Sequence, residues 1–174
     1  NLYIFFIGVL TSFSLPPYNF WIINFFTFSL LFITLVRNND KNLKVFFLYG
    51  YSFGFGYFLS SLYWIPFSLS YDENFNSYIP IAIIIIPAFL SLFYAFAFSV
   101  FKFFFNSKNI FVSIITFSLF LSFFEFLRGN ILSGFPWNLF AYSLSKNINL
   151  IQINSLIGIY AFNMIVISIF SAPS

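Results

Sequence analysis

The sequence predicts an all-α protein, a polytopic transmembrane helix bundle of five to six spans with at least one span kinked by proline. Of its 174 residues, 61% are hydrophobic and only 6% are charged, and the mean hydropathy is +0.96. Soluble domains carry about 25% charged residues, so this chain could not keep a water-facing surface hydrated. Several apolar stretches approach the roughly 20 residues that a helix needs to cross a bilayer. We therefore expect one transmembrane domain over residues 1–174.

The first two spans are expected at residues 2–15 and 18–36, on either side of a pair of prolines. Pro16 and Pro17 must interrupt any helix, because proline lacks the backbone N–H and restricts the residue before it. The first stretch is short for a span. It does not resemble a signal peptide, since no basic segment precedes it and no small-residue cleavage site follows it.

The third stretch, residues 43–69, is longer than one span requires. As a continuous helix it would reach roughly 40 Å, against about 30 Å of hydrocarbon, so it should tilt or protrude unless Pro66 ends the helix early. Gly50 and Gly54 lie four residues apart within it, a spacing that lets helices approach closely. We expect this packing to serve contacts inside a monomer rather than dimerisation.

The remaining spans follow two further loops. Pro87 lies inside the fourth span and predicts a kink there, tolerated because neighbouring groups can satisfy the freed carbonyl. The predicted spans are residues 2–15, 18–36, 43–69, 78–105, 110–127 and 150–170.

Charge placement predicts the orientation of these spans. Five of the seven basic residues flank two loops, 37–42 and 106–109, which two spans separate and which therefore lie on one side. The positive-inside rule makes that side cytoplasmic. Loops 70–77 and 128–149 then lie on the opposite, periplasmic side. With so few basic residues, all near membrane boundaries, the net charge of +3 indicates membrane orientation rather than nucleic-acid binding.

One polar cluster stands at that outer boundary. Glu125 and Arg128 are three residues apart, so they share a helix face. They could form a structural ion pair that fixes the helix end. Alternatively, because charge at membrane depth usually marks function, Arg128 could donate to a phospholipid phosphate while Glu125 holds the guanidinium in place.

A non-helical turn follows the pair, made by Gly134, Phe135, Pro136 and Trp137. Trp137 could be an interfacial anchor, because tryptophan is enriched at membrane boundaries. The neighbouring glycine and proline also allow a second interpretation, in which the turn forms a shaped lip at the membrane surface. Irregular backbone at such depth is tolerated only where protein or water covers it.

These residues resemble the signature of the bacterial apolipoprotein N-acyltransferase family. The matching segments are "EFLRG" (125–129) and "SGFPWNLFAYS" (133–143), supported by "SLPPYNFW" (14–21), "GFGYFLSSLYW" (54–64) and "LIGIYAFNMIV" (156–166). Asn130, Ser133 and Ala141 depart from the family pattern, which usually has Trp, Thr and Gly there. The resemblance adds Trp64, at the end of the third helix, to the candidate lipid-binding residues Glu125, Arg128, Gly134, Phe135, Pro136 and Trp137.

The resemblance implies a reaction and a division of labour. Family members join this membrane domain to a periplasmic nitrilase-like domain, whose Cys takes an acyl chain from phospholipid and passes it to the diacylglyceryl-cysteine of a lipoprotein. A Glu serves as base and a Lys stabilises the oxyanion. This chain has no Cys and no His, so it offers neither a thiol nucleophile nor thiolate or imidazole metal ligands.

The resemblance therefore predicts the membrane part of an acyltransferase of the bacterial inner membrane. We expect a fragment that is inactive alone, needs no cofactor and contacts phospholipid, lipoprotein and bilayer. A small transporter or a structural membrane protein is the alternative. Transporters usually place ionisable pairs near the bilayer midplane, whereas the only such pair here lies near one end of a span.

Overall fold

The computed structural model describes residues 1–105, 108–131 and 134–174, and this part of the chain contains helices and no strand. The predicted all-α class is therefore confirmed. The α-helices are α1 (Leu2–Ser12), α2 (Ile23–Arg37), α3 (Leu43–Leu62), α4 (Ile79–Phe104), α5 (Ile110–Asn130), α6 (Ile148–Ile151), α7 (Asn154–Ile157) and α8 (Ile159–Ser171). Three 3-10 helices lie between them, η1 (Ile65–Tyr71), η2 (Glu73–Tyr78) and η3 (Phe140–Leu144).

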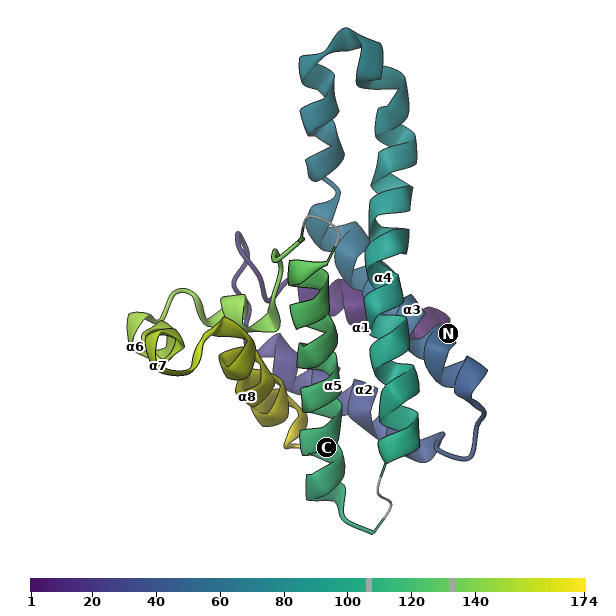
Figure 1. Ribbon diagram of the computed structural model, residues 1–174, viewed down its shortest axis with the longest axis vertical. Helices are drawn as coiled ribbons and strands as arrows, with labels where there is room; N and C mark the ends of the chain where they lie inside the picture. The colour runs from purple at the N-terminus through teal and green to yellow at the C-terminus, as the bar shows by residue number, and fades with distance from the viewer. Residues whose placement is uncertain (106–107, 132–133) are drawn as a thin grey trace.

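Three long helices form the centre of the bundle. α4 packs against α3 on one side and α5 on the other, while α1 lies against α3 and α8 lies against both α5 and α2. Figure 1 shows α4 and α5 running side by side, with the η1–η2 hairpin and the start of α4 standing beyond the rest of the molecule. In the described part of the chain, three helical segments are long and apolar enough to cross a membrane: 43–62, 73–104 and 110–130. The membrane character is thus supported, and the count of five to six spans stays a prediction.

The first two predicted spans are shorter as helices than the sequence suggested. α1 has 11 residues and α2 has 15, because residues 13–22 form a turn around Pro16 and Pro17. The prolines end α1 and delay the start of α2, as their missing N–H groups and restricted φ require. The interruption of the helix at the two prolines was predicted, but the length of the non-helical segment around them was not.

The third stretch also ends early as an α-helix. α3 stops at Leu62, and residues 65–71 continue as the 3-10 helix η1, which has Pro66 in its first turn. This matches the alternative in which Pro66 ends the long helix. Pro87 lies inside α4, which continues unbroken to Phe104; the kink predicted there stays a prediction.

The last predicted span, 150–170, is not one continuous helix. It is divided into α6, α7 and α8, and Gly158 separates the last two with a φ of +79°. Glycine adopts this conformation without steric cost. An apolar run in the sequence does not reveal such a break, because hydropathy is insensitive to backbone conformation.

Aromatic side chains fill the core where α2, α3 and α4 meet η3. The buried Phe140 ring lies 4.8 Å from the Phe28 ring and 5.0 Å from the Tyr57 ring, measured between centroids. α3 can approach α4 closely because Gly50 has no side chain; a Cβ there would overlap the carbonyl oxygen of Tyr94. The predicted use of small residues for packing within the chain is confirmed at this contact.

Candidate functional site

The Glu125–Arg128 pair lies at the end of α5 and is completely buried. Arg128 Nη2 stands 3.7 Å from Glu125 Oε1, and neither side chain is exposed. The guanidinium carbon also lies 5.1 Å from the centre of the Phe58 ring and 5.8 Å from that of Phe135. Such cation–π contacts stabilise a desolvated guanidinium. The predicted pairing of the two residues is therefore present.

Glu125 is held by side chains from two other helices. The Tyr94 hydroxyl of α4 donates to Glu125 Oε1 over 2.7 Å, and the Asn163 amide of α8 donates to Glu125 Oε2. A buried carboxylate needs such donors, because water is not available to solvate it. Glu125 thus joins α4, α5 and α8 at one point.

Asn163 extends this network to the chain after the turn. Its Oδ1 accepts from the backbone N–H of Ala141 over 2.9 Å, and its Nδ2 also lies 3.2 Å from Ser122 Oγ. A single amide side chain therefore fixes both the carboxylate and the start of η3. Asn163 was not predicted as a site residue, although a lone amide inside the apolar segment "IYAFNMIV" was a signal that could have found it.

Arg128 holds the turn itself. Its Nη1 donates to the carbonyl oxygens of Phe135 and Trp137, both over 2.8 Å, and the Phe135 N–H returns a bond to the Arg128 carbonyl. Gly134 has a φ of +75°, and a Cβ there would overlap the carbonyl oxygen of Gly129. Glycine is needed at this position for both reasons. Arg128 therefore holds the backbone of the turn in place through these hydrogen bonds.

The turn segment 134–137, which we call the lip, exposes its apolar side chains. Trp137 is 63% exposed, Pro136 is exposed and Phe135 is half-buried. Tyr57 fixes the next residue by donating to the Asn138 carbonyl over 2.9 Å. The backbone of the lip is thus anchored in the core while the side chains of Pro136 and Trp137 stay exposed.

Trp64 lies near the lip and does not join the buried network. It is 59% exposed and donates from Nε1 to the Ser61 carbonyl. It shares the lining of a cavity of about 250 Å³ with Asn138 and the Pro16–Pro17 turn. The structure therefore places Trp64 beside the residue that follows Trp137.

A separate apolar cavity of about 350 Å³ has residues of the lip in its wall. Arg128, Gly134 and Phe135 form one wall of it. The opposite wall comes mainly from α4: Ile85, Ile86, Phe89, Leu90 and Phe93. Among the described residues, Arg128 Nε and Nη2 have no hydrogen-bond partner. Nη2 still forms the ion pair with Glu125. A buried guanidinium with donors that make no hydrogen bond, beside an apolar cavity, is suited to a molecule with a polar head and a hydrocarbon chain.

Comparison with known proteins identifies the family. The model for the apolipoprotein N-acyltransferase N-terminal domain matches residues 7–172. The chain belongs to the apolipoprotein N-acyltransferase family. This confirms the family resemblance predicted from "EFLRG" and "SGFPW". Ser133, one of the departures from the signature, lies outside the residues that the structure describes.

Individual apolipoprotein N-acyltransferases agree with this assignment. The protein of that name from Rhodopseudomonas palustris is 34% identical over 171 residues, covering 96% of this chain and 32% of the relative. The one from Rickettsia prowazekii is 37% identical over 164 residues, covering 94% and 32%. The chain therefore spans about a third of the length of these curated relatives and corresponds to their N-terminal domain.

Proposed function

We propose that this chain is the membrane domain of an enzyme that transfers an acyl chain from phospholipid to the N-terminal diacylglyceryl-cysteine of lipoproteins. The family assignment supports acyl transfer over the small transporter considered as the alternative. The nucleophile must come from a part of the enzyme outside these residues, because the chain contains no Cys. We expect the chain alone to transfer no acyl group.

The role proposed for this domain is to receive the donor lipid at the lip. The observation that carries the proposal is that Arg128 lines the apolar cavity together with Gly134 and Phe135 of the lip. Among the described residues its Nε makes no hydrogen bond, and its Nη2 has only the ion pair with Glu125. A lipid chain would lie against α4, and the oxygen atoms of its head would accept from Arg128. Because the Arg128 side chain is buried in this structure, lipid entry requires the lip to shift.

The proposal includes an orientation. The lip would face the periplasm in the bacterial inner membrane, where a nitrilase-like domain could reach the ester. The five-to-two distribution of basic residues supports this orientation. The proposal treats the protein as a monomer.

The test uses Arg128→Lys in the full-length enzyme. Lysine keeps the positive charge beside Glu125 but cannot donate as a planar fork to Phe135, Trp137 and a lipid head together. We expect normal membrane abundance and a fall of about tenfold or more in acyl loading of the nucleophile, the loss expected for one or two charge-assisted hydrogen bonds.

The control is Lys44→Arg, a basic exchange at the exposed start of α3, which should leave acyl loading unchanged. Normal abundance together with normal acyl loading in Arg128→Lys would show that the pair is structural only. Lost abundance would be separated from lost function by measuring the loading per molecule of enzyme in the membrane.

A further inference from the structure

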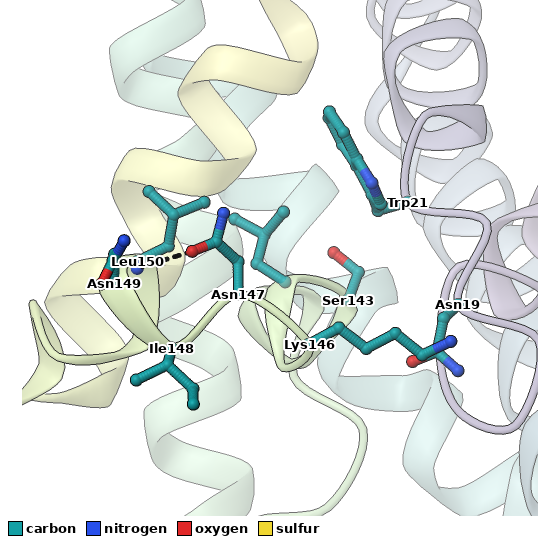
Figure 2. Close-up of a pocket in the computed structure, with 9 residues that line it drawn as sticks. Asn19, Trp21, Ser143, Lys146, Asn147, Ile148, Asn149 and Leu150 are labelled. Atoms are coloured by element: carbon teal, nitrogen blue, oxygen red, sulfur yellow. Dashed lines mark hydrogen bonds between the residues drawn. The ribbon is translucent and has the colours of Figure 1, made fainter.

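A third cavity has none of the lip residues in its lining and lies between the turn before α2 and the segment that runs from η3 into α6. Its volume is about 490 Å³. Its wall includes Asn19 and Trp21 from the first segment and Lys146, Asn147 and Asn149 from the second. Figure 2 shows the Lys146 side chain extended toward Asn19, with the Trp21 ring on the same side of the cavity. None of these residues has a role in the proposed acyl transfer.

The wall of this cavity carries a positive charge that no acidic residue in the wall balances. Lys146 is exposed and makes no ion pair with any residue in the described ranges. The chain has four acidic residues, and none of them is among the residues that line the cavity. A cation without an opposing carboxylate, set in a concave wall, attracts an anion.

The neutral polar groups in the wall favour an anion that accepts several hydrogen bonds. Asn147 uses its Oδ1 to accept from the backbone N–H of Leu150, so its amide N–H donors remain for other acceptors. Asn149 adds a second amide. Phosphate oxygens accept readily from amide and ammonium donors.

The surroundings of the cavity are apolar. Phe20 is 63% exposed, Ile22 is 58% exposed and Ile148 is 71% exposed, all within or next to the two segments that form the wall. Such side chains cannot stabilise a free aqueous ion, but they suit the glycerol and acyl chains of a lipid. Trp21 fits the same boundary, because its ring is amphipathic.

We infer that this cavity binds the phosphate of a membrane glycerophospholipid whose headgroup carries a net negative charge. Lys146 pairs with the phosphate on the side of the cavity where Asn19 lies, and the Asn147 and Asn149 amides, on the opposite side of the wall, donate to glycerol and headgroup oxygens of the same lipid. An anionic headgroup is preferred over a zwitterionic one, because the cavity wall holds no carboxylate to pair with an ammonium group. The site requires no acyl-transfer chemistry and therefore goes beyond the proposed function.

The experiment measures lipid retained by the full-length protein in native mass spectrometry after titration in detergent. The probes are a phosphatidylglycerol and a phosphatidylethanolamine with identical acyl chains, each with and without excess inorganic phosphate. We expect tighter retention of phosphatidylglycerol and no displacement by inorganic phosphate. Lys146→Gln should weaken that retention by about fivefold, a modest loss because water weakens the charge contacts of an exposed lysine.

Lys44→Gln is the matched control, since it removes the same charge from the exposed start of α3, and it should leave retention unchanged. Equal retention of the two lipids, equal losses in the two variants, or full displacement by inorganic phosphate would each overturn the inference. Acyl transfer is not measured, so failure here would leave the proposed function untouched.

Discussion

Glu125 and Arg128 bind hydroxyl, amide and backbone groups that lie elsewhere in the sequence. The carboxylate reaches α4 and α8 through Tyr94 and Asn163, and the guanidinium reaches the carbonyl groups of Phe135 and Trp137. The i, i+3 spacing was enough to predict the pair. It could not predict partners that are 31 and 38 residues away from Glu125, because those contacts depend on how the helices pack.

Asn163→Ala tests the network at its most distant member. The change leaves Glu125 Oε2 without that donor and the Ala141 N–H without its acceptor, and each unsatisfied buried group costs about 1–3 kcal/mol. We expect a clear fall in the thermal stability of the full-length protein in detergent. Asn76→Ala, at an exposed position in η2, is the control and should change the stability little. Equal stabilities for the two variants would contradict the network.

Trp137→Tyr tests whether the lip shapes a substrate site. The Trp137 side chain is 63% exposed, and its contact with Arg128 is made by the backbone carbonyl, so the substitution should be tolerated in folding. An interfacial anchor accepts tyrosine, because both rings are amphipathic. A lip residue does not, since misplacing reacting groups by about 1 Å can lower rates on the order of a hundredfold.

The measurement is acyl transfer by the full-length enzyme at matched membrane abundance. We expect Trp137→Tyr to reduce the rate by tenfold or more on this scale. Trp21→Tyr, a second exposed tryptophan, is the control and should retain the rate. If Trp137→Tyr transfers acyl chains as fast as the unmodified enzyme, Trp137 is an anchor alone.

At the scale of the helices, the sequence predicted where α-helices must break better than where they resume. Pro16, Pro17 and Pro66 all lie at or just beyond the end of an α-helix, as missing N–H groups require. The division of residues 148–171 into three helices was missed, because Gly158 sits in an otherwise apolar run and its positive φ is a property of the fold. Apolar length predicts membrane affinity more reliably than it predicts helix continuity.

The contact between α3 and α4 provides a test at this scale. Gly50→Val would drive a side chain into the backbone of Tyr94 and Ala95, and overpacking of this kind costs about 1–3 kcal/mol or more. Because α4 carries Tyr94 and one wall of the apolar cavity, we expect lower thermal stability together with reduced acyl transfer. Ala161→Val, at an exposed position of α8, should leave both unchanged. A Gly50→Val protein of normal stability would contradict the close approach of the two helices.

For the molecule as a whole, the two ends of α4 define the two sides of the membrane in our proposal. Lys102, near the C-terminal end of α4, donates to Asn39 in the basic 37–42 loop. The N-terminal end of α4 leads from η2 and the acidic loop. α4 has 26 residues, roughly 39 Å at the helical rise per residue, so it is long enough to place these two loops on opposite sides of a bilayer whose core is about 30 Å thick.

Single cysteines at Asp40 and Asn74 test this orientation in a chain that has no cysteine of its own. Both positions are exposed, so each thiol should react readily once a reagent reaches it. In intact cells whose outer membrane has been made permeable, we expect an impermeant thiol reagent to label Asn74→Cys. Asp40→Cys should be labelled only after the inner membrane is opened, because the positive-inside rule places its loop in the cytoplasm. Labelling of Asp40→Cys alone before opening would reverse the orientation and separate the lip from a periplasmic catalytic domain. Labelling of both positions before opening would contradict the placement of these loops on opposite sides of the membrane.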